Sequence, residues 1–140
     1  MKRQSLLLGL GLAAVLAGAT VCKTAGSSGP SDTPKDDPSF AADIQPIFTS
    51  SCALSSCHAG AAAGGLNLAS GQSYNNLVNV ASTGEPNRIR VVPNDATNSY
   101  LVVKLEGRQT VGSKMPLGGS LSATALQNIK NWVNKGAKNN

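Results

Sequence analysis

The amino-acid sequence predicts a small, mainly α-helical domain, and three observations support that fold class. Residues 122–136 carry an apolar stripe at helical spacing. In residues 98–105, Leu101 and Leu105 lie four positions apart, and Gly107 follows as a C-terminal cap. No segment alternates apolar and polar residues for long enough to form a sheet. We therefore expect one domain of helices joined by loops.

The final helix is the clearest of the expected elements. Ser122 is placed to cap its N-terminus, and Leu121 can pack against Leu126 across the first turn. Gly136 is expected to end the helix. The apolar stripe consists of Leu126, Ile129, Trp132 and Val133. We therefore expect Trp132 to lie in the core rather than at a binding site.

Another helix is expected near the start of the folded part, leading directly into Cys52. Asp43 is its candidate N-cap. Pro46 falls in the first turn, where the missing N–H of proline is tolerated. Ile44 and Phe48 would then share one buried face of this helix.

Loops and short segments connect these helices. Residues 59–65 are small and can lie close against a flat ligand, because they carry almost no side chains. One or two helical turns are expected over residues 74–78. Residues 88–93 are expected to be extended, because β-branched residues there precede a proline. Residues 108–120 should form a glycine-rich loop.

Residues 1–21 have the pattern of an export signal. Lys2 and Arg3 precede an apolar run from Leu6 to Ala19, and small residues follow. The run is shorter than the about 20 apolar residues that a membrane-spanning helix needs. We therefore expect an exported protein, located in the periplasm or at a membrane surface.

Cys22 stands where a bacterial lipoprotein carries its lipid-modified cysteine. The residues before it fit the lipoprotein pattern only in part, and cleavage after Ala19 is the competing interpretation. Cysteine pairing favours lipidation, because three cysteines in an oxidising compartment would leave one unpaired. Residues 22–39 are then a flexible polar linker, and residues 40–138 are the folded domain.

The composition indicates a basic protein with a thin core. The formal net charge of +5 indicates either ordinary surface solubility or attraction toward an acidic partner. Nucleic acid is not expected as a partner, because no basic run is interleaved with aromatic residues. The few aromatic residues of the chain leave room for an apolar cofactor at the centre of the core.

The motif with the most chemical content is Cys52-Ala53-Leu54-Ser55-Ser56-Cys57-His58. Two cysteines followed at once by a histidine are how covalently attached haem is held. The thiols become thioethers to the porphyrin, and the adjacent imidazole binds the iron. The usual motif has two residues between the cysteines, whereas this chain has four. The small extra residues can bulge outward while Cys52 still reaches the haem.

Three other interpretations of these residues stay open. A Cys52–Cys57 disulfide with an idle histidine is credible in an exported protein. A zinc site would need four ligands, and the chain offers two thiolates here and a single histidine. A thiol nucleophile is disfavoured by an oxidising compartment.

Met115 is the candidate for the second axial ligand of a haem iron. His58 is the only histidine of the chain, so a second imidazole ligand is excluded. Met1 belongs to the leader, which leaves Met115 as the only thioether of the mature chain. Its position in a glycine-rich loop would let it fold over a haem face.

Together these features resemble a class I c-type cytochrome. The resemblance rests on the helix that leads into the cysteine motif, on Val92-Pro93, on the helix from Asn98, and on Lys114-Met115-Pro116. The closing helix adds Trp132-Val133 and Gly136-Ala137. The similarity covers about residues 40–137 and is closest to small periplasmic monohaem cytochrome c domains. The expanded CxxxxCH spacing departs from the family pattern.

The resemblance implies N- and C-terminal helices packed across one another around one haem, bound between His58 and Met115. It also implies an electron carrier rather than an enzyme, working with redox partner proteins. A backbone carbonyl is expected to orient His58. Two alternatives are a haem enzyme or sensor with an open sixth iron position, and a haem-free, disulfide-bonded binding domain.

Several basic residues are candidates for roles around the haem. Lys104, Arg108 and Lys114 lie before or in the loop of Met115, so they are candidates for a face that docks acidic redox partners. Arg88 and Arg90 are candidates to neutralise haem propionates. Ordinary solvated charge is the alternative for each of the five.

Overall fold

The computed structural model describes residues 33–60 and 62–140. The expected leader over residues 1–21, the lipidation site Cys22 and the linker up to residue 32 lie outside the described residues. None of the helices in the described part has the length and apolar character that crossing a membrane requires.

Helices are the only regular elements of the described residues, so the expectation of a mainly α fold is confirmed. They are η1 (Phe40–Ile44, a π-helical turn), α1 (Gln45–Ser51), η2 (Ala63–Gly65, a 3₁₀ turn), α2 (Ser73–Leu77), α3 (Tyr100–Glu106) and α4 (Ala123–Asn134). Isolated backbone bridges join Val78 to Val91 and Ala81 to Ile89. The expectation of an extended segment over residues 88–93 therefore holds only at these bridges, because Arg88 and Arg90 lie in bends and Pro93 in a turn.

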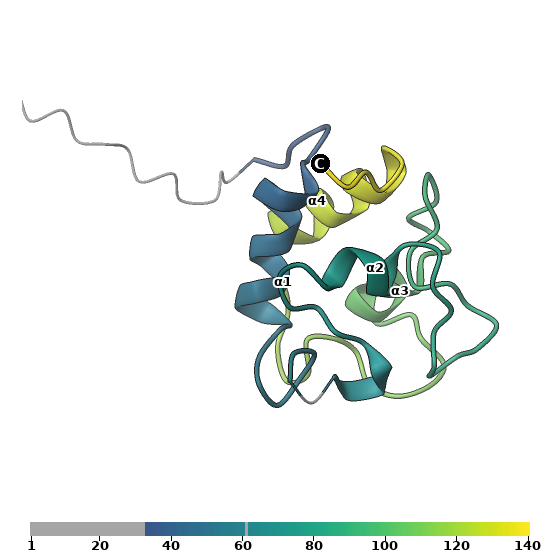
Figure 1. Cartoon of the computed structure of the whole chain (residues 1–140). Coiled ribbons are helices and arrows are strands. Elements are labelled where there is room, and N and C mark those ends of the chain that lie inside the picture. The colour runs from purple at the N-terminus through teal and green to yellow at the C-terminus, as the bar shows by residue number, and fades with distance from the viewer. Residues whose placement is uncertain (1–32, 61) are drawn as a thin grey trace, which may run out of the picture.

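η1 and α1 form one continuous helical segment along a side of the molecule (Figure 1). The prediction of Asp43 as N-cap is wrong, because the helix already begins at Phe40. Ser39 is the cap, and its side chain accepts a hydrogen bond from the N–H of Ala42. The Asp43 carboxylate accepts from the N–H of Ser39 at 2.9 Å, so Asp43 closes a reciprocal pair like a capping box.

α4 packs against η1 through a cluster of four aromatic rings, which we call the aromatic cluster: Phe40, Phe48, Tyr74 and Trp132. The ring centroid of Phe40 lies 5.2 Å from that of Trp132 and 5.3 Å from that of Tyr74. These distances are typical of favourable ring contacts. The cluster therefore joins η1, α2 and α4, which are far apart in the sequence.

The ends and the buried face of α4 agree with the sequence prediction. The hydroxyl of Ser122 accepts a hydrogen bond from the N–H of Ala125 at 3.1 Å, as an N-cap does. Gly136 follows the helix with a φ of 96°, which only glycine adopts without strain. Trp132 is buried in the core. Its indole N–H donates to the carbonyl of Lys138.

α3 also ends as the sequence predicts, at Gly107 with a φ of 78°. It begins at Tyr100 rather than at Asn98. Ser99 does not cap the helix with its side chain, because the hydroxyl donates to the carbonyl of Asp95 at 2.7 Å instead. α3 packs against α4, so the two later helices support the same core.

Contacts of the domain begin before Phe40. The N–H of Lys35 donates to the side chain of Asn128 at 2.8 Å, and the Lys35 carbonyl accepts from Asn131 at 2.6 Å. Pro38 is fully buried. Residues 35–39, which the sequence assigned to the linker, therefore lie against α4 and the C-terminal segment.

Candidate cofactor site

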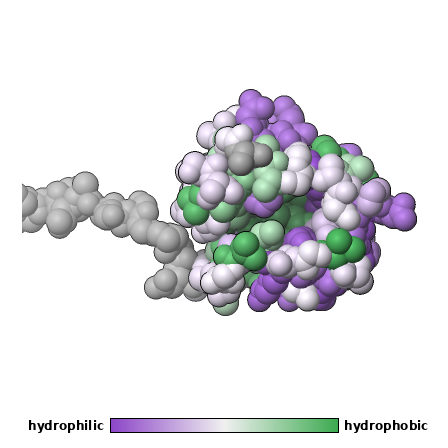
Figure 2. Space-filling view, turned by 90° about the horizontal axis from the view of Figure 1, so that it is seen from below, coloured by the Kyte–Doolittle hydropathy of each residue, from purple (hydrophilic) through white to green (hydrophobic). Residues whose placement is uncertain are grey.

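A cavity of about 410 Å³ opens at one end of the molecule, beside the C-terminal end of α1. Figure 2 looks into its mouth and shows a hollow with a hydrophobic lining. Its volume falls within the roughly 300–1,000 Å³ that is usual for small-molecule and cofactor sites. The aliphatic lining residues are Leu54, Leu66, Leu68, Leu77, Leu101, Leu105, Val111 and Leu117.

Exposed hydrophobic side chains gather at this cavity. Among the described residues, the large hydrophobic side chains that are exposed are Leu54, Val111 and Leu117, and Leu117 is 74% exposed. All three line the cavity. Clustered apolar side chains at a surface mark a place where an apolar ligand or a partner binds. The cavity is therefore suited to a largely apolar group.

The cysteine motif forms part of the cavity wall. The N–H of Cys52, at the end of α1, donates to the carbonyl of Phe48 at 2.8 Å. The N–H of His58 donates back to the carbonyl of Cys52 at 3.1 Å, which closes residues 52–58 into a loop. Residues 54–56 are exposed. Leu54 and Ser56 nevertheless line the cavity together with Cys52, Cys57 and His58, so the extra residues bulge outward only in part.

The thiols of Cys52 and Cys57 are free and partly buried. Burial, together with the nearby thiol of Cys57, raises the pKa of Cys52 to about 11. Cys52 is therefore protonated at neutral pH. A protonated thiol is a weak nucleophile, so Cys52 lacks the lowered pKa that activates a catalytic cysteine.

His58 is oriented by a backbone carbonyl. Its Nδ1 lies 3.0 Å from the carbonyl oxygen of Ala63, at the start of η2. The N–H of Ala63 in turn donates to the carbonyl of Cys57 at 3.0 Å, so the turn is fixed to the motif. Because a carbonyl only accepts, Nδ1 carries the proton and Nε2 keeps a lone pair for a metal. The resemblance implied that a backbone carbonyl orients His58, and the structure has the Ala63 carbonyl at hydrogen-bond distance from the ring.

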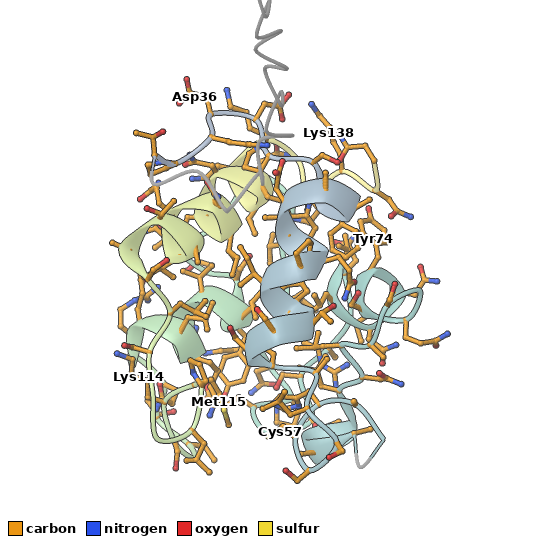
Figure 3. All side chains as sticks on the ribbon, turned by 90° about the vertical axis from the view of Figure 1, so that its left-hand side faces the viewer. Asp36, Cys57, Tyr74, Lys114, Met115 and Lys138 are labelled. Carbon is orange, nitrogen blue, oxygen red and sulfur yellow. The ribbon has the colours of Figure 1, made fainter. Side chains whose placement is uncertain are left out.

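Met115 lines the same cavity from the loop between α3 and α4. Its N–H donates to the carbonyl of Lys104 at 3.0 Å, which ties the loop to α3. Its side chain is partly buried and packs against the hydrophobic core. Figure 3 shows Met115 and Cys57 at the same end of the molecule. The structure therefore brings together all four residues that the sequence predicts around a haem: Cys52, Cys57, His58 and Met115.

Arg90 lines the cavity as a buried cation. Its side chain is only 7% exposed and donates to the carbonyls of Asn76 at 2.8 Å and Gly65 at 3.1 Å. Within residues 33–60 and 62–140, no ion pair joins Arg90 to a carboxylate. Desolvation lowers the pKa of Arg90, as burial of an uncompensated cation does. A negatively charged group in the cavity would compensate this charge.

The other basic residues predicted around the haem take different places. Arg88 pairs with Glu85 at 2.7 Å and is absent from the cavity lining. Lys104 lines the cavity, and its Nζ donates to the carbonyl of Val111 at 3.3 Å. Arg108 pairs with Glu106 at 2.7 Å. Of the candidates for a docking face, only Lys104 is therefore part of the cavity wall.

Sequence reasoning missed Glu85 and Tyr100. The hydroxyl of Tyr100 lies at the cavity and donates to Glu85 Oε1 at 3.2 Å. Neither residue belongs to a motif with recognisable spacing, and their contacts join segments that only the fold brings together. The sequence carries no signal for them beyond the scarcity of acidic residues.

The described residues contain no group of three His, Cys, Asp or Glu side chains that converge as metal ligands. Cys52, Cys57 and His58 therefore do not converge as the ligands of a zinc ion, although all three line the cavity.

No protein-family model matches the chain, and no curated protein or solved structure is significantly similar to it.

Proposed function

We propose that this chain is an electron-transfer protein that carries one electron on a covalently bound haem c. Cys52 and Cys57 would hold the haem through thioethers, and His58 and Met115 would be the axial ligands of its iron. The observation that carries the proposal is the shared cavity. All four residues line it, although they come from two distant segments of the chain.

The residues around the cavity fit a haem in shape and in charge. A porphyrin is flat and largely apolar, and the lining is mostly leucine and valine. Haem also carries carboxylate groups at one edge, and Arg90 supplies a buried cation without a carboxylate partner among the described residues. The donor set of one imidazole and one thioether suits haem iron.

Each cysteine has a defined role in the attachment. Its thiol would add across a vinyl group, with the sulfur going to one carbon and the hydrogen to the other. The hydrogen bond from His58 N–H to the Cys52 carbonyl closes the motif despite its four-residue gap. Cys52 and Cys57 therefore both face the cavity, as two thioethers require.

His58 would bind the iron through Nε2. The Ala63 carbonyl accepts the proton of Nδ1, which fixes the tautomer and the orientation of the ring. A ring held in this way stays in place when the charge of the iron changes. The contact supports a ligand role for His58 over an idle surface histidine.

Haem, when bound, supplies an iron that takes up and releases one electron. The protein would hold ligands on both sides of it, so that little rearrangement accompanies a change of charge. Buried side chains such as Leu68 and Leu77 would exclude water from the cavity. Val111 and Leu117 at the mouth, with Lys104 beside them, would face a redox partner with an acidic docking surface.

The proposal places the domain among class I c-type cytochromes. The packing of η1 against α4 supports this, because N- and C-terminal helices cross one another in that family. Export to the periplasm belongs to the same proposal and rests on residues 1–21. A lipid at Cys22 would hold the domain at a membrane surface.

The test begins with the exported full chain. A haem-stained denaturing gel and the intact mass should show a haem that survives denaturation, because thioethers are covalent. An unstained chain of unmodified mass would contradict the proposal and favour a haem-free binding domain.

The axial ligands are tested with Met115→Ala. The variant should lose the long-wavelength absorption band of ferric iron bound to methionine sulfur, and its reduction potential should fall. Ser113→Ala is the control, because Ser113 lies in the same loop, is exposed and does not line the cavity. If Met115→Ala keeps the band, Met115 is not the ligand. A parent protein without this band would favour a haem enzyme or sensor with an open sixth position.

A further inference from the structure

The loop that carries Met115 is held in place by contacts from outside the loop. Residues 109–114 contain no helix or strand, and most of them are exposed. The N–H of Met115 binds the carbonyl of Lys104, which fixes one end of the segment. The middle of the segment reaches across the cavity mouth, where Val111 and Gly112 line the cavity.

The carboxylate of Glu85 holds the middle of this loop. Glu85 Oε1 accepts from the N–H of Thr110 at 3.2 Å, from the Thr110 hydroxyl at 3.1 Å and from the N–H of Val111 at 3.2 Å. Two consecutive backbone N–H groups that point at one oxygen form a small anion-binding concavity. Thr110 and Val111 of the loop thus both donate to one oxygen, Glu85 Oε1, which belongs to a segment distant in the sequence.

Glu85 is itself held firmly from its other sides. Arg88 donates to Oε2 at 2.7 Å, and the Tyr100 hydroxyl donates to Oε1 at 3.2 Å. The Ser82 hydroxyl accepts from the N–H of Glu85 at 3.3 Å and so fixes the turn that presents it. The carboxylate therefore has a defined position between α3 and the 82–88 turn.

Lys104 forms a second set of contacts with the loop, and one of them is at Met115. Lys104 Nζ donates to the carbonyl of Val111 at 3.3 Å, while the Lys104 carbonyl accepts from the N–H of Met115. Lys104 therefore binds the loop both beside the Glu85 contact and at Met115. Figure 3 shows Lys114 and Met115 at the same end of the molecule.

We propose that Glu85 is a positioning residue, whose carboxylate holds the 109–114 loop across the cavity so that the Met115 sulfur stays at the iron. This inference rests on the proposed function, because it assigns Glu85 a role toward the axial ligand. Glu85 does not line the cavity, so it would act through Thr110, Val111 and the loop that they belong to.

Two variants of the full, haem-loaded chain test the role, and a third is the control. Glu85→Ala removes the acceptor, and Glu85→Gln keeps an oxygen of the same reach without the charge. Asp43→Asn is the matched control, because the side chains of Asp43 and Glu85 are both 13% exposed. Asp43 belongs to η1, and its carboxylate binds residues just before that helix rather than the 109–114 loop. The measurements are amide hydrogen exchange at Thr110 and Val111, the methionine–iron absorption band and the reduction potential.

In Glu85→Ala, amide exchange at Thr110 and Val111 should accelerate about tenfold or more, because each amide loses a charged acceptor. The methionine–iron band should weaken and the potential should fall, with smaller changes of the same sign in Glu85→Gln. Asp43→Asn should change none of the three readouts. If Glu85→Ala does not fold, the same comparison is made with Glu85→Gln.

The inference is overturned if the Glu85 variants match Asp43→Asn in either amide exchange or the methionine–iron band. A loose loop with an intact band would show that Met115 needs no such support. If the unaltered chain carries no haem, the proposed function and the role toward the iron fail together. Amide exchange then still reports whether Glu85 holds the loop, which separates the two failures.

Discussion

Nδ1 of His58 lies 3.0 Å from the carbonyl oxygen of Ala63, and this contact makes the η2 turn a part of the candidate site. The turn depends on left-handed backbone, with φ values of 65° at Gly64 and 62° at Gly65. A residue with a side chain adopts this conformation only at a cost. The orientation of the histidine therefore depends on two glycines that shape the turn carrying the Ala63 carbonyl.

The first prediction concerns Gly65. Gly65→Ala should lower the free energy of unfolding by about 1–2 kcal/mol, because alanine is strained at a positive φ. The reduction potential should shift as well, since the Ala63 carbonyl moves with the turn. Urea unfolding and redox titration measure the two effects. Gly119→Ala is the control, because no atom within 4 Å would meet the new methyl group there. Equal effects in both variants would contradict the prediction.

The second prediction addresses the four-residue gap between the cysteines. Cys52→Ala and Cys57→Ala should each keep one thioether, because both thiols line the cavity. Each loss leaves one vinyl group conjugated with the porphyrin, so the denatured, reduced haem should absorb at a longer wavelength than in the parent.

Cys22→Ser is the control for these variants and should leave that spectrum unchanged. An unshifted spectrum for Cys52→Ala would show that Cys52 carries no haem bond and that Cys57 is the single attachment point.

The third prediction compares Arg88 with Arg90, which the sequence offered equally as candidates to neutralise haem propionates. Arg90→Lys should lower the free energy of unfolding by about 1–3 kcal/mol, because one ammonium group cannot reach all the buried carbonyls that the guanidinium serves. Arg88→Lys should cost about 0–1 kcal/mol, because Arg88 forms a partly exposed ion pair. Chemical denaturation measures both, and a larger loss at Arg88 would refute the assignment of Arg90 as the buried cation.

Predictions from the sequence succeeded where the determining contacts are local. Ser122 caps α4 and Gly107 ends α3, because each depends on a few neighbouring residues. The cysteine motif and Met115 were predicted from residue type and scarcity; the fold places them at one cavity, and their role toward a haem stays a prediction. The sequence did not reveal that Ser39 rather than Asp43 begins the first helix, because the start depends on the burial of Phe40.

Other parts of the site depend on contacts that no local pattern encodes. The Glu85 carboxylate and the buried Arg90 bind segments that are distant in the sequence. The Ala63 carbonyl is only five residues from His58, but it reaches the imidazole through a turn that no motif marks. Arg88 and Arg90 are two positions apart and equally basic. Only the fold shows that one lines the cavity while the other pairs with Glu85.

The fourth prediction concerns acid. Desolvation raises the pKa of Glu85, but the hydrogen bonds from Arg88, Thr110 and Val111 outweigh it and lower the pKa below its ordinary value of 4.5. A lowered pKa means that Glu85 stabilises the fold fully above pH 4.5, and that this contribution is lost as the pH falls through the folded-state pKa. Arg88 and the Tyr100 hydroxyl donate to the carboxylate, and Lys104 lies over the Tyr100 ring.

The difference in unfolding free energy between the parent and Glu85→Gln should therefore be constant above pH 4.5 and shrink in stronger acid. The methionine–iron band should weaken over the same acid range in the parent. Denaturation curves and spectra recorded from neutral to acidic pH measure both. A difference that grows toward low pH would contradict the sign of the pKa shift.

The aromatic cluster lies apart from the cavity, and none of its four rings lines the cavity. Tyr74 also lies well away from Cys57 and Met115 in Figure 3. η1 and α4 therefore pack against each other through side chains that lie outside the cavity. The cavity is lined instead by the cysteine motif, by leucines of α2 and α3 and by the loop of Met115. The contacts between η1 and α4 should therefore persist whether the cavity is filled or not.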